Sequence, residues 1–458
     1  TDQDASRAVF DGTLLAALLA LTTSSYVLYA LTSTGGTHDD YMHFLMAKYA
    51  IQHPTLYLNP WGKPFFTGVV SVAILLLGDH GLLSARIANI VMATGTLLVT
   101  FRLVLKIFRR RTASVLSCVL LAFTPAFFQA SYSALTETSF AFLTSLFLYF
   151  HYTSRTNNAA LMLSLSTLAR LEAFLFIPIY AILSWRKLKV VGPILISWPL
   201  GWSFANYICY NDFWLLFRAY PLVSSVEIGW LRPGPIFWYP VNMPLILGWV
   251  PLFLCLAGLT SSIRWRNHAL VHLMAGAFLA FNSLAFSFGL FGSSGLLRYF
   301  VSIAPLFGFY LASGFRLADL KLSALNSSTA RMPISIKGLV FLAIVSASIG
   351  PTLHSASPFS INPNDIALVD AGRFLKDQGY TSDKVYLFHP VVAYYGGIDP
   401  FVHNLGQVKA GIPKGSIVVW ESNYSPMLGL DREYLNTEGF RIVKEFESGY
   451  TPVIIYQR

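Results

Sequence analysis

Long apolar segments recur along the first 353 residues of the chain, and they constrain the fold more than any other feature. A helix of about 20 apolar residues spans the hydrocarbon core of a bilayer. The chain is 55% hydrophobic and only 12% charged, whereas soluble domains carry about 25% charged residues. We therefore predict a polytopic α-helical membrane protein with about eleven transmembrane helices, at residues 10–31, 82–106, 113–130, 134–152, 158–170, 172–185, 190–208, 241–260, 267–288, 298–315 and 336–353.

The charged residues between these segments predict an orientation. With the N-terminus inside, the inner loops carry fourteen Lys and Arg residues and the outer loops carry seven, as the positive-inside rule requires. All seven acidic residues between positions 12 and 318 then lie outside, which indicates a functional outer face. The net charge of +10 follows from this topology, so we predict no nucleic-acid partner.

Residues 354–458 have a different composition and predict a soluble, extracytoplasmic α/β domain that follows a transmembrane domain of residues 1–353. Its expected helix runs from Asn364 to Gly379. Its expected strands cover residues 384–389, 416–421, 440–446 and 452–456. His389, His403 and Glu421 are interpreted as isolated surface residues of this domain.

Three further outer segments have distinct patterns. Residues 40–52 predict a helix that Asp39 or Asp40 caps. Residues 64–78 are apolar but short, and predict an interfacial or re-entrant helix. Residues 209–240 are rich in aromatic residues, Gly and Pro, and predict a mobile loop.

Two adjacent carboxylates, Asp39 and Asp40, stand directly after the first apolar segment. Like charges crowded at a membrane surface are costly, and they favour a general base, a metal ligand or both. His38 precedes them and could complete a divalent metal site with Asp40. The structural alternative is helix capping in an exposed loop.

Other charged residues recur at the outer ends of the predicted spans. Glu137, Arg170 and Glu172 occupy two successive outer turns, and Arg170 could pair with either acid as a structural contact. On an α-helix, however, residues two apart do not face each other. Lys63 and Arg298 could bind a phosphate; the alternative is contact with lipid headgroups.

The order of these motifs resembles the type C glycosyltransferases, a polytopic superfamily that uses polyprenyl-phosphate sugars. It includes protein O-mannosyltransferases, aminoarabinose transferases and the mannosyltransferases of GPI assembly. The resemblance covers residues 10–353 and rests on short motifs, which are Asp39-Asp40 after His38 (without the Pro of the family's His-Pro-Asp-Glu variant), Trp61-Gly62-Lys63-Pro64, Ser84-Ala85-Arg86, Thr136-Glu137-Thr138, Ala169-Arg170-Leu171-Glu172, and Arg298-Tyr299-Phe300 with Pro305.

The resemblance implies an inverting transfer from a lipid-phosphate sugar to a glycan, lipid or protein acceptor. Asp39 or Asp40 would be the general base, with Asp39 favoured. Lys63, Arg298 and Tyr299 would hold the donor phosphate, whereas Glu137, Arg170 and Glu172 would shape the site. Some members bind a metal ion and others do not, so a divalent metal stays an open expectation.

Two other functions are compatible with this sequence. One is a transporter or flippase of a lipid-linked solute, and the other is a ligase acting on undecaprenyl-diphosphate glycans. The absence of an internal repeat and the one-sided acids disfavour transport. The predicted location is the plasma (inner) membrane of a prokaryote in preference to the endoplasmic reticulum.

Overall fold

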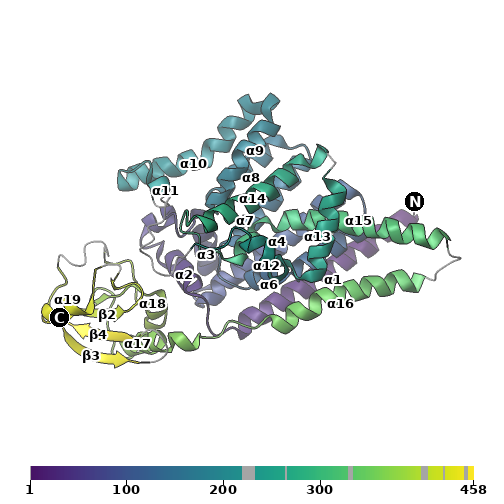
Figure 1. Cartoon of the computed structure of the whole chain (residues 1–458). Helices are drawn as coiled ribbons and strands as arrows, with labels where there is room; N and C mark the ends of the chain where they lie inside the picture. Colours follow the sequence, from purple (N-terminus) through teal and green to yellow (C-terminus); the bar gives the residue numbers. More distant parts are fainter. Residues whose placement is uncertain are drawn as a thin grey trace.

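Helices dominate the computed structural model, and a small sheet closes its C-terminal end (Figure 1). The structure describes residues 2–218, 233–263, 266–328, 334–403, 411–426, 429–447 and 452–458. The helices up to residue 218 are α1 (Asp2–Thr32), α2 (His38–Tyr49), η1 (Pro54–Leu58), α3 (Pro64–Leu77), α4 (Leu82–Phe108), α5 (Arg111–Ala122), α6 (Pro125–Ser131), α7 (Glu137–Tyr152), α8 (Thr156–Ser166), η2 (Leu171–Leu175), α9 (Phe176–Leu183), η3 (Trp185–Lys187), α10 (Leu188–Tyr210) and α11 (Leu215–Arg218).

The remaining elements complete the helical body and form the C-terminal domain. The helical body adds α12 (Trp238–Leu247), α13 (Trp249–Ser262), η4 (Arg266–His268), α14 (Ala269–Ser287), η5 (Leu297–Ile303), α15 (Ala304–Ser328) and α16 (Ile334–Ser355). The C-terminal domain contains η6 (Pro363–Asp365), α17 (Ile366–Asp377), β1 (Val385–Tyr386), α18 (Pro390–Gly396), β2 (Ile417–Glu421), α19 (Arg432–Thr437), β3 (Arg441–Phe446) and β4 (Val453–Gln457).

The described residues contain five helices that are long and apolar enough to cross a membrane alone, or seven if each bent helix pair counts as one span. The bent pairs are α5 with α6, at 71°, and α12 with α13, at 118°. The predicted spans at 134–152, 158–170 and 172–185 are shorter helices, namely α7, α8 and η2 with α9. The chain is thus a multi-span membrane protein, but many of its predicted spans are broken or short.

Two of the segments that the sequence places outside the membrane can be compared with the structure. Residues 64–77 form α3, as the predicted short helix requires, and its first residue is Pro64, a residue that suits the first turn of a helix. The predicted loop at 209–240 contains the end of α10, the short α11 and the start of α12, and its residues 219–232 lie outside the described part of the chain.

Close contact between α13 and α15 organises the inner part of the helical body. A Cβ atom added to Gly258 would lie 1.9 Å from the backbone oxygen of Tyr310, and one added to Gly314 would lie 2.0 Å from that of Leu254. Small residues allow this approach, which is a common way to pack helices in membranes. Since η5 leads directly into α15, the contact also fixes the segment that carries Arg298.

The C-terminal sheet has the order β1-β2-β4-β3. Strand β1 pairs with β2 in parallel, with Val385 opposite Ile417. Strand β4 runs antiparallel to both β2 and β3, with Val419 opposite Ile455. All four predicted strands and the predicted helix are therefore present, although β1 contains two residues and α17 begins after a short 3₁₀ turn.

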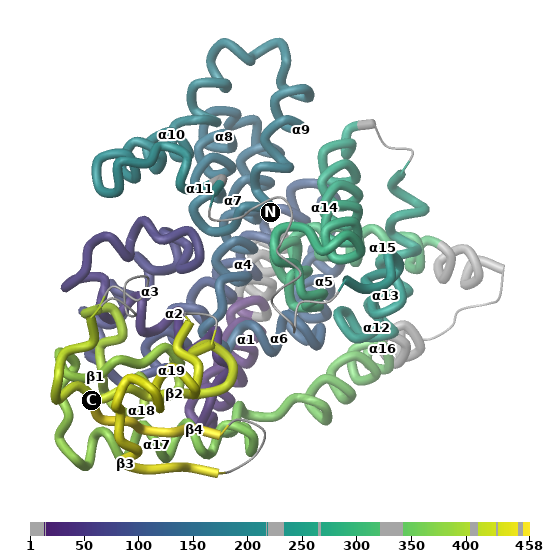
Figure 2. The backbone as a smooth tube through the Cα atoms, turned by 60° about the vertical axis from the view of Figure 1, so that its left-hand side comes forward, coloured from purple at the N-terminus to yellow at the C-terminus, as the bar shows by residue number. Residues whose placement is uncertain are grey.

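The C-terminal domain shares a hydrophobic core with α2 and with parts of α3 and α4. This core joins Tyr41 and Phe44 of α2 to Leu368 of α17 and Val392 of α18, and it extends to the sheet. Figure 2 shows α17 and α18 beside α2 and the end of α1. The packing holds α2 between the membrane helices and the sheet.

Candidate functional site

The first turn of α2 separates the two predicted carboxylates. Thr37 is the N-cap, and Asp40 is the third helical residue of a capping box. One Asp40 carboxylate oxygen accepts hydrogen bonds from Thr37 N at 2.7 Å and Thr37 Oγ1 at 2.8 Å, and the other accepts one from Ala134 N at 2.7 Å. The prediction that Asp39 or Asp40 is the cap residue is therefore wrong. Thr37 is the N-cap, and the Asp40 carboxylate completes the capping box by accepting the hydrogen bond from the Thr37 backbone.

Asp40 is completely buried between α2 and the loop before α7. Burial raises the pKa of its carboxyl group, while the hydrogen bonds from Thr37 and Ala134 act in the opposite direction. Because protein groups bind both carboxylate oxygens, Asp40 anchors α2 to the helical body. Both of its carboxylate oxygens are engaged by the protein, so neither is available to a substrate.

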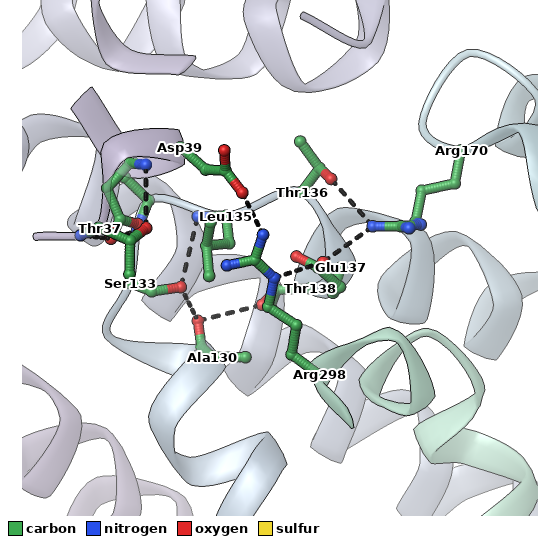
Figure 3. A network of polar contacts seen from close by, with 12 residues as sticks. Thr37, Asp39, Ala130, Ser133, Leu135, Thr136, Glu137, Thr138, Arg170 and Arg298 are labelled. Atoms are coloured by element: carbon green, nitrogen blue, oxygen red, sulfur yellow. Dashed lines mark hydrogen bonds and ion pairs between the residues drawn. The ribbon is translucent and has the colours of Figure 1, made fainter. Parts of the chain in front are cut away.

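Asp39 points the other way, toward the charged side chains of the helical body (Figure 3). Its side chain is 38% exposed, and its Oδ2 forms an ion pair with Nη2 of Arg298. Of the two adjacent carboxylates, Asp39 is the one that water reaches. The structure thus brings Asp39 and Arg298 together across 259 positions of sequence.

A buried network of charges continues from Arg298 into the protein (Figure 3). Glu137 is 2% exposed, and its Oε1 lies 3.3 Å from Nε of Arg298 and 2.9 Å from Nη1 of Arg170. Arg170 also contacts Glu172 Oε1 through Nη2, at 2.7 Å. Two predicted residues that lie far apart in sequence, Arg170 and Arg298, therefore converge on the carboxylate of Glu137.

Arg170 and Glu172 face each other despite their spacing of two residues. Arg170 has an extended backbone, with φ −157° and ψ 145°, and Glu172 lies in the 3₁₀ helix that follows. The α-helical geometry assumed from the sequence is therefore wrong at this point. The guanidinium of Arg170 also lies over the ring of Tyr299, 4.9 Å from its centre, so Tyr299 belongs to the same cluster.

Lys63 immediately precedes α3 and has a backbone φ of 60°, a region that non-glycine residues rarely occupy. Its ammonium group donates a hydrogen bond to the carbonyl of Pro60 at 2.9 Å. Although Lys63 keeps some exposed surface, the protein around it desolvates the ammonium group and lowers its pKa to about 7, and Arg170 acts in the same direction. Glu172 and Glu137 oppose this shift, which places Lys63 within electrostatic reach of the network.

His43 is a member of the site that the sequence reading missed. It lies one helical turn after Asp39, is 6% exposed, and stacks on the ring of Trp61 at 4.4 Å between centres. Burial lowers its pKa to about 3, and its Nδ1 has no hydrogen-bond partner within the structure. Its spacing of four residues from Asp39 on a predicted helix was the available signal.

The C-terminal domain meets the site through His38. Nε2 of His38 lies 3.0 Å from Asp365 Oδ2, and its ring packs edge-on against His389 at 4.6 Å. His389 in turn packs against Tyr424 at 5.3 Å.

The interpretation of His389 and Glu421 as surface residues is wrong, because each is 1% exposed. The carboxylate of Glu421 accepts hydrogen bonds from the backbone N–H groups of residues 423–425. His403 stacks on Tyr386 with 3.9 Å between ring centres. All three side chains therefore have structural contacts inside the C-terminal domain.

The two residues proposed for a metal ion do not converge. His38 is directed at Asp365, whereas the Asp40 oxygens bind Thr37 and Ala134. In the ranges that the structure describes, no group of three or more His, Cys, Asp or Glu residues is arranged to hold a metal ion. His38 and Asp40 therefore do not fit a shared metal, and we derive no reaction step through one.

Comparison with known proteins identifies the fold. No family model and no curated protein sequence matches the chain. Among solved structures, it is similar to the crystal structure of ArnT from Cupriavidus metallidurans bound to undecaprenyl phosphate, with a TM-score of 0.65 and 13% identity over 96% of this chain and 97% of that one. The apo structure of the same protein matches with a TM-score of 0.63 and 14% identity over 98% of each chain. The chain therefore has the ArnT fold over nearly its full length, which confirms the resemblance to the type C glycosyltransferases at the level of the fold.

Proposed function

We propose that this protein is an inverting glycosyltransferase that moves a sugar from a polyprenyl-phosphate donor to an acceptor on the extracytoplasmic face of the membrane. One observation carries the proposal. A water-accessible carboxylate, Asp39, lies beside a cluster of partly or fully buried charges that contains Arg298, Arg170 and Lys63. A carboxylate next to such cations matches a reaction that needs both a base and charge stabilisation.

In this reaction, the Asp39 carboxylate takes the proton of an acceptor hydroxyl group. The acceptor oxygen forms a bond to the anomeric carbon of the sugar as the bond from that carbon to the phosphate oxygen breaks. The electron pair of the broken bond leaves with the polyprenyl phosphate. Lys63 and Arg298 stabilise the negative charge that develops on this leaving group.

Other parts of the site support the same assignment. Arg170 is held by Glu172 and Glu137 under the ring of Tyr299, so it keeps the network in place and leaves the phosphate to Lys63 and Arg298. ArnT was crystallised with undecaprenyl phosphate, and the shared fold makes this lipid the first donor carrier to test. The sugar and the acceptor are left open.

Transport is the second class to separate from this proposal. The charged cluster lies where α2, the start of α7 and the start of η5 meet, and α2 packs against the C-terminal domain, which the sequence predicts to lie outside the membrane. Transporters bind their substrates near the middle of the membrane. A glycan ligase, the third candidate, would act on the same face as the proposed glycosyltransferase. It would differ from that enzyme in using a diphosphate donor.

The test is a donor-consumption assay with purified protein and a panel of polyprenyl-phosphate and polyprenyl-diphosphate sugars. We expect release of free polyprenyl phosphate, loss of release in Asp39→Asn, and unchanged release in Asp79→Asn. Asp79 is a suitable control because it pairs with Lys48 at 3.0 Å, away from the cluster. A parallel series with EDTA measures any metal requirement.

The assay also identifies failure. Full activity in Asp39→Asn would remove this residue from the mechanism. Movement of labelled lipid across liposomes with no chemical product would establish transport instead. Release of product only from diphosphate donors would identify a ligase.

A further inference from the structure

Arg298 contacts Asp39 in the structure, whereas the proposed function, on which this inference rests, requires it to contact the donor phosphate. In the structure, its Nη2 is paired with Asp39 and its Nε lies 3.3 Å from Glu137. During transfer, the same guanidinium has to face the donor phosphate. A planar guanidinium forms its strongest contacts with one bidentate anion at a time.

The contact with Arg298 also restrains the base. Nη2 of Arg298 donates to Oδ2 of Asp39, so an acceptor hydroxyl group has to compete with the guanidinium for that oxygen. Asp39 is consequently less accessible to an acceptor while Arg298 holds it.

We propose that Arg298 is a donor-controlled latch on Asp39. Without donor, Arg298 holds the carboxylate of Asp39. When the donor phosphate arrives, the Nη groups of Arg298 turn to it, and Asp39 is released to accept a proton. The base therefore becomes fully active only after the donor is bound, and the donor binds before the acceptor.

Glu137 is the positioning residue for this exchange. Its Oε1 contacts Arg170 and Arg298, while its Oε2 is buried and has no hydrogen-bond partner within the structure. Arg170 is fixed in turn by Glu172. Arg298 can thus keep the contact of its Nε with Glu137 while its Nη groups turn from Asp39 to the phosphate.

The backbone before Arg298 is suited to a change of position. Gly289, Gly292 and Gly295 all have left-handed φ angles between 64° and 70°. Phe291 has a φ of 55°, which is strained for a bulky residue. Strained segments of this kind cluster at ligand-binding and switch regions.

The latch makes an unusual prediction about a catalytic variant. Asp39→Asn should bind undecaprenyl phosphate about fivefold more tightly than the wild type, because Arg298 no longer has to leave an ion pair, and it should also lose transfer. Asp39 is partly exposed, so the variant should keep its fold. The probe is undecaprenyl phosphate, and the readout is its equilibrium dissociation constant in detergent.

A double-mutant cycle separates the latch from simple charge repulsion. In an Arg298→Gln background, Asp39→Asn should change the affinity less than twofold, because no latch remains to be released. An equal gain in both backgrounds would show direct repulsion and would overturn the proposal. Asp79→Asn removes a carboxylate elsewhere on the protein and should leave the affinity unchanged.

The remaining outcomes are distinct from failure of the proposed function. If wild-type protein binds the lipid and transfers sugar, but Asp39→Asn binds equally or more weakly, the latch is wrong and the glycosyltransferase stands. If wild-type protein does not bind undecaprenyl phosphate or any polyprenyl-phosphate sugar, the proposed function is wrong and the latch falls with it.

Discussion

At the scale of single residues, two adjacent aspartates differ in their burial and in their contacts. The Asp40 carboxylate receives hydrogen bonds from two other residues and is fully buried, whereas Asp39 keeps contact with water and reaches Arg298. Their order in the sequence does not reveal this difference. It depends on the amide of Ala134, which lies 94 positions away from Asp40.

Lys63 predicts a pH dependence for donor binding. Its pKa is lowered to about 7 in the unliganded protein, chiefly by burial. A phosphate ester binds the protonated ammonium, so affinity should be constant below pH 7 and fall by up to about tenfold per pH unit above it. A polyprenyl-phosphate sugar is the appropriate ligand because its phosphodiester keeps one negative charge across this range.

Lys63→Arg provides the matched comparison. Arginine stays protonated at all these pH values, so its affinity curve should be flat between pH 6 and 9 even if its absolute affinity differs. A wild-type curve that is equally flat would show that Lys63 does not meet the phosphate as a titrating group.

At the scale of elements, the sequence predicted types more reliably than ends. The apolar stretch after Lys63 and the four strands were predictable from periodicity and from Gly and Pro punctuation. The bends between α5 and α6 and between α12 and α13 were not, because each bent pair retains the apolar composition of one continuous span. Similarly, the contact between Arg170 and Glu172 was not predictable, because Arg170 has an extended backbone and Glu172 lies in a 3₁₀ helix where an α-helix was assumed.

The α13–α15 contact gives an element-scale prediction. Gly258→Ala should lower the thermal stability of the protein strongly, since the added methyl group would overlap the backbone of Tyr310. It should also weaken binding of undecaprenyl phosphate, because α15 follows η5 and its Arg298.

Gly276→Ala is the internal control for this change. Gly276 also lies in a helix, α14, but outside its own helical turn no atom of the described residues lies within 4 Å of its added Cβ. Alanine is favoured over glycine in helices by about 1 kcal/mol, so this variant should be as stable as the wild type or slightly more so. Equal melting temperatures for Gly258→Ala and Gly276→Ala would contradict the close contact.

At the scale of the whole molecule, the C-terminal domain shares a hydrophobic core with α2. Two His–Asp pairs reinforce this contact, His38 with Asp365 at 3.0 Å and His53 with Asp399 at 2.8 Å. The separate composition of residues 354–458 predicted a domain, but it could not predict these pairs. They join segments more than 300 positions apart, and no local pattern marks such partners.

This docking predicts that the C-terminal domain supports the base from a distance. Asp365→Asn removes the charge that holds His38, the residue next to Asp39, so the first turn of α2 should loosen. We expect faster amide hydrogen exchange over residues 36–42 and a several-fold loss of donor consumption. Binding of undecaprenyl phosphate should not fall, because Arg298 and Lys63 lie on other elements and a looser Asp39 holds Arg298 less firmly.

Asp370→Asn makes the same chemical change one helical turn and a half away. The Asp370 side chain is 47% exposed on α17, and its partner Arg373 lies on the same helix at 3.6 Å, so this variant removes no direct ion pair with α2. It should show wild-type exchange and activity. Identical behaviour of the two variants would mean that the domain merely covers the site. A selective effect of Asp365→Asn would mean that the fold uses a soluble domain to position a residue at the membrane surface, which explains why the two share one core.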